Sequence, residues 1–208
     1  MKTEILPEST SRASASSLWM SSPMPMVTLV KTFDITRVVK TAKKRGVKFN
    51  ALMCWCVNRA ALRVEEFHTL PEKGKLYKYD QLAINVIVKN KKGGLSFCDI
   101  PCTESFQEFV DYYNRITRKT INECEHNCLD GYMVIGTSAV VGTEIDVIVN
   151  QFNDQFCNPM VMWGKYRKGW FKTTLPISFQ FHHVQMDGQQ AARFLEFLQE
   201  EINKVSTI

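Results

Sequence analysis

Residues 181–188 read FHHVQMDG, and this run is the most informative part of the 208-residue chain. His182 and His183, two of only four histidines, stand side by side in it. The alternating residues before them predict a strand, and Asp187 and Gly188 after them predict the start of a helix. A histidine at such a turn, with a carboxylate close behind it, is a common way to build a general base.

Strand parity distinguishes the two histidines. Every second residue from Ile177 to Phe181 is apolar, and His183 continues that series, whereas His182 continues the polar series that begins at Ser178. We therefore expect His183 on the apolar face, where partial loss of solvent favours a neutral imidazole that can accept a proton from a hydroxyl. A plainer interpretation also stays open, in which the histidine is buried and hydrogen-bonded and the Asp only caps the helix.

The hydrophobic pattern outside this run predicts a mixture of helices and strands. Helices are expected near residues 36–45, 50–65 and 103–124 and after Asp187, and strands near residues 27–35, 81–88, 93–100, 132–140, 144–150, 159–167 and 170–183. Because the strands and helices do not alternate strictly, we expect an α+β fold in which helices cover a large mixed β-sheet.

The chain is expected to hold one domain after an N-terminal arm. Residues 1–26 are rich in Ser, Thr, Pro and Met and show little periodicity, which predicts an irregular arm or a weak helix. Residues 27–208 contain no internal repeat and no linker. We expect them to form a single domain with one sizeable core.

Composition and charge argue against several classes of protein. The chain is 45% hydrophobic with a net charge of +5, and no apolar run is long enough to span a membrane. The basic residues are dispersed and accompany no nucleic-acid-binding motif. No secretory leader is visible, and seven cysteines, an odd number, do not complete a disulfide framework. We therefore expect a cytoplasmic protein with reduced thiols that binds neither membranes nor nucleic acid.

The cysteines leave a metal-binding structural protein open as an alternative. Cys98 and Cys102 are four positions apart, and Cys124, His126 and Cys128 lie close together further along the chain. Neither spacing is the usual zinc knuckle, and the two groups fall in different expected elements. We therefore expect no metal.

The pattern HHxxxDG is the signature of the CoA-dependent acyltransferase superfamily, and the chain resembles its type A chloramphenicol O-acetyltransferases from about Arg12 to Val205. That family's first strand and first two helices resemble the segment VTLVKTFDITRVVKTAKKRGVKFNALMCWCVNRA, and its next loop and strand resemble FHTLPEKGKLYKYDQLAINVIV. Its later segments resemble, in order, ESFQEFVDYYNRI, NPMVMWGKYRKG and LPISFQFHHVQMDG. The resemblance implies the two-layer fold of those enzymes.

The resemblance also implies a reaction, which is acetyl transfer from acetyl-CoA to the hydroxyl of a small molecule such as chloramphenicol. His183 matches the family's general base, because it lies four residues before the Asp. Asp187 matches an Asp that pairs with an N-terminal Arg and organises the site, and Arg12 is the candidate for that Arg. His183, Asp187 and Arg12 are therefore the expected catalytic set.

Three further residues resemble the family's CoA-binding positions. Lys165 and Tyr166 follow Gly164 as in the family's GKY or GKF, where the Lys would meet a phosphate and the Tyr would pack against the adenine. Lys48 falls where the family often has a basic residue near CoA. The resemblance further implies a homotrimer with active sites between subunits, and a role in antibiotic resistance.

The chain departs from the family at two positions. Val141 stands where the family has a Ser whose hydroxyl binds the oxyanion, and a Val cannot donate a hydrogen bond. Thr143, two residues later, is the candidate replacement, with Ser138 as the alternative, and Met162 stands where the family has a Thr. These departures leave open a second hypothesis, in which the chain binds acyl-CoA or another ligand without efficient transfer.

Overall fold

The computed structural model describes residues 1–153 and 156–208. Its main feature is a seven-stranded sheet in the order β2-β10-β8-β7-β5-β6, with β9 paired to β10. The β5–β7 and β7–β8 pairs are parallel, and the other pairs are antiparallel. The strands are β2 (Met26–Asp34), β5 (Gln81–Lys89), β6 (Leu95–Pro101), β7 (Tyr132–Val140), β8 (Met160–Gly164), β9 (Arg167–Lys168) and β10 (Thr173–His182).

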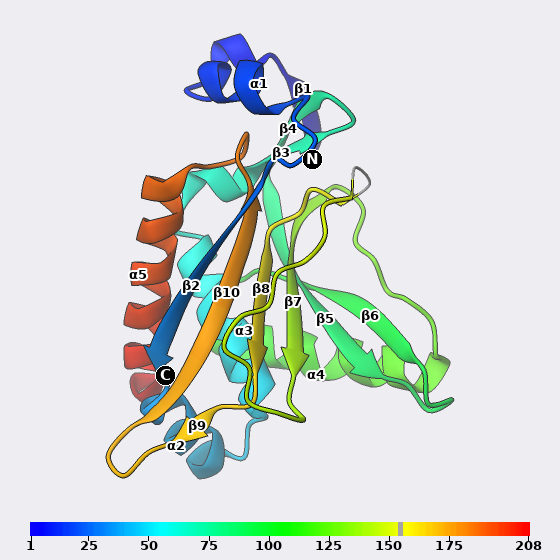
Figure 1. Cartoon of the computed structure of the whole chain (residues 1–208). Coiled ribbons are helices and arrows are strands. Elements are labelled where there is room, and N and C mark those ends of the chain that lie inside the picture. The colour runs from blue at the N-terminus through cyan, green and yellow to red at the C-terminus, as the bar shows by residue number, and fades with distance from the viewer. Residues whose placement is uncertain (154–155) are drawn as a thin grey trace.

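Helices cover one face of this sheet, as Figure 1 shows. They are α2 (Thr36–Arg45), α3 (Phe49–Ala61), α4 (Phe106–Glu123) and α5 (Gly188–Lys204). The expected α+β fold, a large mixed sheet covered by helices, is therefore confirmed.

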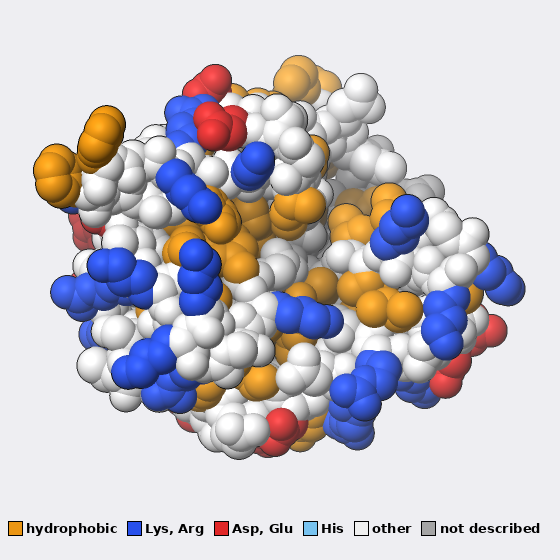
Figure 2. Space-filling view, turned by 90° about the horizontal axis from the view of Figure 1, so that it is seen from below, with side chains coloured by type: hydrophobic (Ala, Val, Ile, Leu, Met, Phe, Trp, Pro, Cys, Tyr) orange, Lys and Arg blue, Asp and Glu red, His pale blue; other side chains and the backbone are white. Residues whose placement is uncertain are grey.

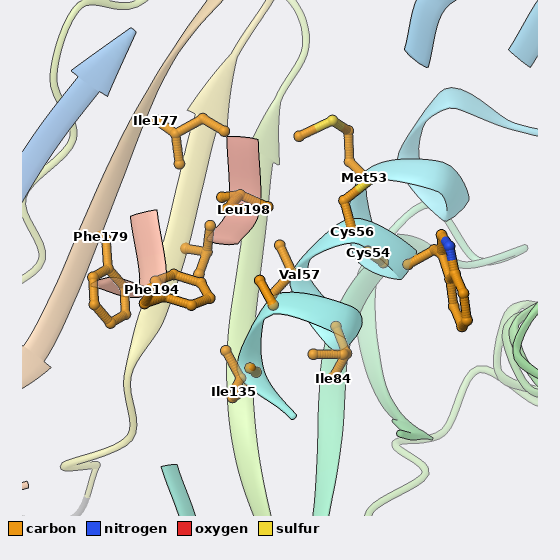
Figure 3. Packing of buried hydrophobic residues seen from close by; sticks show 14 of the residues in the cluster. Met53, Cys54, Cys56, Val57, Ile84, Ile135, Ile177, Phe179, Phe194 and Leu198 are labelled. Carbon is orange, nitrogen blue, oxygen red and sulfur yellow. The ribbon is translucent and has the colours of Figure 1, made fainter. Parts of the chain in front are cut away.

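The core lies between the helices and the sheet. Phe179 of β10 packs against Phe194 of α5, with 4.6 Å between the ring centroids. Figure 3 shows Leu198 of the same helix between this pair and Val57 of α3. Helix α5 presents one apolar stripe to the core, whereas α3 is apolar on most sides because it is buried between the sheet and its neighbouring helices.

The N-terminal segment is more ordered than the sequence indicates. It contains strand β1 (Lys2–Ile5) and helix α1 (Ala13–Trp19), and β1 joins a small sheet with β3 (Thr69–Glu72) and β4 (Lys75–Tyr79). The sequence predicts an irregular arm or a weak helix here, which agrees with α1. It does not predict β1, because a four-residue strand is too short to show a clear alternation. The division of the chain into an arm and a domain stays a prediction.

The other face of the main sheet is partly covered by an irregular segment, residues 141–153 and 156–158. The strand expected near 144–150 is wrong, because this segment meets β10 through side chains. The Ile148 N–H donates to Ser178 Oγ at 2.9 Å, and Gln180 Nε2 donates to the carbonyl oxygen of Asn150 at 3.0 Å. Both β10 side chains are nearly fully buried as a result.

Candidate functional site

The FHHVQMDG run forms a tight turn between β10 and α5. The strand ends at His182, and Asp187 is the N-cap of the helix that begins at Gly188. The Asp187 carboxylate accepts a hydrogen bond from the Gln189 N–H at 3.3 Å, and the Gln190 side chain accepts one from the Asp187 N–H at 3.2 Å. This reciprocal capping fixes the start of the helix, and therefore the end of the turn.

His182 is the more buried of the two histidines, which corrects the expectation from strand parity. It is only 3% exposed, and its Nδ1 accepts a hydrogen bond from the Val184 N–H at 3.0 Å. Burial lowers the pKa of His182 to about 4, and the adjacent His183 adds to the shift. His182 does lie on the face of Ser178 and Gln180, but the irregular segment covers that face, and its Phe152 packs against the His182 ring.

His183 is half-buried and its ring is held flat against an aromatic neighbour. Its imidazole stacks on the indole of Trp19 in α1, with 4.7 Å between ring centroids and 4° between the ring planes. The backbone N–H of His183 donates to the carbonyl oxygen of Pro25 at 2.8 Å. The ring atom Nδ1 is buried without a hydrogen-bond partner among the described residues. Nε2 is therefore the nitrogen that is available to a bound hydroxyl.

Arg12 binds three groups of this turn with one guanidinium. Its Nη2 donates to the carbonyl oxygen of His183 at 2.8 Å, and its Nε donates to that of Val184 at 2.9 Å. Its Nη1 lies 3.1 Å from Asp187 Oδ2. The planar fork of an Arg suits such a cluster of acceptors, and the residue is only 7% exposed. The structure thus brings Arg12, His183 and Asp187 together.

The expected CoA-binding residues form a second cluster. Tyr166 packs against Phe49, the first residue of α3, with 5.2 Å between ring centroids, and Lys48 directly precedes that helix. The Lys165 N–H donates to the carbonyl oxygen of Thr143 at 2.7 Å. The side chains of Lys48 and Lys165 are exposed. Figure 2, which views the molecule from below, shows Lys and Arg side chains around a hollow with hydrophobic side chains inside it.

The two clusters lie at opposite ends of the main sheet. Trp163 of β8 pairs with Ile177 of β10, so Lys165 lies level with Leu175, which precedes His183 by eight positions. A strand of that length spans roughly 26 Å. His183 follows the upper end of β10 in Figure 1, whereas β8 ends at the lower side. Within one chain, His183 and Lys165 are therefore too far apart to contact the same small group of a ligand.

The oxyanion candidate Thr143 and the neighbouring Val141 lie at the same end of the sheet as the expected CoA-binding residues. Val140 pairs with Gly164 at the end of β7, so Val141 and Thr143 follow at the lower end of the sheet. Val141 is 67% exposed, and the Thr143 hydroxyl makes only a 3.5 Å contact with the carbonyl oxygen of Glu144. Met162 is buried within β8 and pairs with Ser178.

A cavity that the sequence does not reveal lies on the open face of the sheet. Its volume is about 1060 Å³, and residues of β5, β6, β7, β8 and β10 form part of its lining. The cavity approaches the histidine turn. Met26, which lines it, pairs with His182, and Phe152, which also lines it, has its ring centroid 6.4 Å from that of His182. The imidazole of His183 is not part of its lining.

The cysteines do not assemble a metal centre in the described part of the chain. No group of three or more His, Cys, Asp or Glu residues there could hold an ion. His126 instead stacks on Phe97 at 3.8 Å and accepts the Phe97 N–H through Nδ1 at 3.2 Å. Burial raises the pKa of Cys54 to about 12 and that of Cys98 to about 11, so both are thiols at neutral pH.

Within residues 1–153 and 156–208, no helix has the length and apolar character needed to cross a membrane.

Comparison with known proteins places this fold and turn in context. The sequence model of the family described as chloramphenicol acetyltransferase matches residues 15–199. A chloramphenicol acetyltransferase of Clostridium perfringens is 28% identical, and the match covers 82% of this chain and 83% of that one. Chloramphenicol acetyltransferase 2 of Escherichia coli is 26% identical, with 82% and 83% covered. A solved chloramphenicol acetyltransferase superposes with a TM-score of 0.82 at 18% identity, covering 97% and 100%.

Proposed function

The chain belongs to the chloramphenicol acetyltransferase family and is an acyltransferase, and we propose that it acetylates the hydroxyl of a small molecule with His183 as general base. Acetyl-CoA is the acetyl donor that this family implies. The observation that carries the proposal is the geometry at His183, whose ring is stacked, whose backbone is bound by Arg12, and whose Nδ1 is shielded.

In the proposed reaction, His183 Nε2 takes the proton of the acceptor hydroxyl while that oxygen attacks the thioester carbonyl carbon. The new C–O bond forms, and the C–S bond breaks as the tetrahedral intermediate collapses. The protonated His183 then returns its proton to the departing CoA sulfur, so the ring is neutral again. Proximity of the two substrates supplies much of the acceleration, because no acyl-enzyme is needed.

Arg12 and Asp187 act as positioning residues in this proposal. Arg12 holds the His183 carbonyl at 2.8 Å, and Asp187 caps the helix that ends the turn. Neither side chain moves a proton, because the guanidinium cannot lose one in a protein and the carboxylate bonds to Arg12 and Gln189. Both residues hold the His183 imidazole in position.

The lower cluster is the proposed binding site for the CoA nucleotide. Lys48 and Lys165 supply exposed positive charge for its phosphates, and Tyr166, half-buried against Phe49, offers a ring for the adenine. Thr143 is the proposed oxyanion donor, because its hydroxyl makes no strong hydrogen bond of its own.

A homotrimer with active sites between subunits would reconcile the two separated clusters. The base of one subunit would then face the CoA-binding end of the next, whereas the two lie at opposite ends of the sheet within one chain. We further propose a cytoplasmic enzyme that acts on chloramphenicol or a similar hydroxyl compound, and therefore a role in antibiotic resistance.

The alternative is a member of the fold that binds acyl-CoA without efficient transfer. The specific observation in its favour is Val141, which offers no donor at the family's Ser position and is 67% exposed. Loss of one oxyanion donor costs on the order of 10²–10³ in rate.

Release of CoA from acetyl-CoA, followed with a thiol reagent, tests the proposal. The assay is run with chloramphenicol and with a panel of small alcohols. Release that depends on an added acceptor is the expected result. Binding of acetyl-CoA without release for any acceptor would overturn the enzymatic proposal and support the alternative.

A further inference from the structure

The cavity on the open face of the sheet contains one deeply buried carboxylate. Asp99 of β6 lines the cavity and is only 4% exposed. Its Oδ1 accepts a hydrogen bond from Asn85 Nδ2 at 2.8 Å, and its Oδ2 accepts one from the Leu129 N–H at 3.0 Å. Both oxygens therefore act as acceptors of hydrogen bonds from this chain.

No cation balances this charge in the described part of the chain. None of the ion pairs found there, with a limit of 4.0 Å, involves Asp99. Glu72, the other acid that lines the cavity, is already paired with Lys2 at 2.6 Å. Lys73, which also lines the cavity, is exposed in the turn between β3 and β4. A buried carboxylate without a cation is costly, so its presence in a cavity wall points to a ligand.

The negative field of Asp99 reaches the space inside the cavity. Cys128 lines the same wall, and its thiol pKa is raised, first by burial and then by the charge of Asp99. A negative potential raises the pKa of a neighbouring acid, and it raises the affinity for a cation by the same physics.

Five aromatic residues line the cavity beside several Asn and Gln residues. The aromatic residues are Tyr79, Phe97, Tyr132, Phe152 and Phe156. Aromatic faces attract ammonium groups and accept apolar substituents, so a carboxylate within such a wall suits an amine that carries an apolar body. The floor is closed at Gly136, where an added Cβ would lie 2.0 Å from Met160 Sδ. Met160 therefore lies across the glycine, and the sheet leaves no room for a ligand below it.

We propose that this cavity binds the acceptor and selects amino alcohols, with the protonated amine of the ligand at Asp99. That the ligand is the acetyl acceptor rests on the proposed function and on its homotrimer, because His183 of the same chain does not line the cavity and a neighbouring subunit would have to supply the base. Binding of the ligand through its amine does not rest on either. The amine would donate to the Asp99 oxygens, and the apolar body of the ligand would pack against the rings. Asp99 is then a specificity-determining residue, not a member of the base machinery around His183.

Calorimetric titration of the full chain, without acetyl-CoA, tests this inference. The probes are 2-(dimethylamino)-1-phenylethanol and its neutral carbon isostere 3-methyl-1-phenylbutan-1-ol. They differ only in the charged nitrogen, and a tertiary amine cannot form a stable amide. We expect the amine to bind on the order of tenfold more tightly, as for a hydrogen bond to a charged group. Equal or weaker binding of the amine would overturn the inference.

Asp99→Asn should remove that preference while binding of the neutral alcohol stays within about twofold, since the new side chain has the same shape. Asp130→Asn is the matched control, because it removes an exposed carboxylate nearby that does not line the cavity, and it should keep the preference. If Asp99→Asn does not fold, the comparison of the two probes on the unmodified chain still shows whether the cavity prefers an amine. Amine preference without any acetyl transfer would support the site and contradict the proposed function.

Discussion

Arg12 and Asp187 lie 175 positions apart in the sequence and form an ion pair of 3.1 Å. The same guanidinium also binds the carbonyl oxygens of His183 and Val184. The ion pair is therefore one part of a larger clamp on the turn that holds the proposed base. Two of the three bonds go to backbone oxygens, which no other side chain of the described residues is seen to bind.

This clamp predicts that the two partners of the ion pair are not equivalent. Arg12→Ala should lower the free energy of unfolding by about 2 kcal/mol, because it strips donors from buried carbonyl groups. Asp187→Asn should cost less than about 1 kcal/mol, because that side chain is 42% exposed and an Asn still caps a helix. Urea unfolding measures both.

Kinetics of the same variants separate a positioning role from a purely structural one. Arg12→Ala should lower kcat and leave KM for acetyl-CoA unchanged, because Arg12 touches the His183 turn and not the lower cluster. Equal losses of stability in the Arg12 and Asp187 variants would contradict the difference between the two partners. A change confined to KM would show that the clamp does not position His183.

His182 predicts a pH dependence of stability. Its folded-state pKa of about 4 is below the usual 6.5, so between these values the unfolded chain binds more protons than the folded one. The contribution of His182 is fully present above about pH 6.5 and is lost as the pH falls toward 4, by about 3 kcal/mol in all. The measurement is urea unfolding at pH 7, 5.5 and 4.5 and at a fixed protein concentration.

His182→Asn is the matched control for this titration, since its side-chain oxygen can still accept the Val184 N–H. The variant should lose less stability than the unmodified chain over the same pH range. Parallel curves for the two proteins would assign the acid sensitivity to other groups.

Lys48 and Lys165 predict a defect in nucleotide binding alone. The double change Lys48→Ala/Lys165→Ala should raise KM for acetyl-CoA by roughly tenfold, because two charge-assisted phosphate contacts are lost. The KM for S-acetylpantetheine, which lacks the nucleotide, should stay the same, and kcat should change little for either donor. An equal rise of KM for both donors would place the two lysines elsewhere than at the phosphates.

The separation of the two clusters predicts complementation between subunits. His183→Ala and Lys48→Ala/Lys165→Ala chains, each weak alone at low acetyl-CoA, should regain activity when they are unfolded and refolded together. Restoration follows because a mixed assembly contains interfaces with an intact base from one chain and intact lysines from another. Activity no higher than the average of the separate proteins would mean that each site is built from one chain.

Local chemistry explains which parts of the site could be predicted. The turn from β10 to α5 follows from residues that are neighbours in sequence, namely an alternating strand, an Asp cap and a Gly. The relative burial of His182 and His183 was wrong because an irregular segment that is distant in sequence covers the face of β10 on which His182 lies. Arg12 was found only through the resemblance, because its partners lie at the other end of the chain.

Other features depend on contacts that the sequence does not order. The alternation in residues 144–150 resembles a strand, yet the Ile148 N–H bonds to a side chain instead of to a strand backbone. Strands β1, β3 and β4 are too short to show a period. Asp99 accepts hydrogen bonds from Asn85 and Leu129, which come from distant positions, so neither its buried site nor the cavity around it could be inferred from the residues nearby.

The central claim is that His183 takes the proton of the acceptor hydroxyl, and its most direct test is acceptor-dependent CoA release by His183→Gln. Acceptor-dependent release should fall on the order of 10²–10⁴-fold, while the fold and the binding of acetyl-CoA remain unchanged. His182→Asn is the matched control and should keep most of the activity, because His182 is buried and its Nδ1 is already bound. A folded His183→Gln protein that releases CoA within threefold of the unmodified rate would contradict the account.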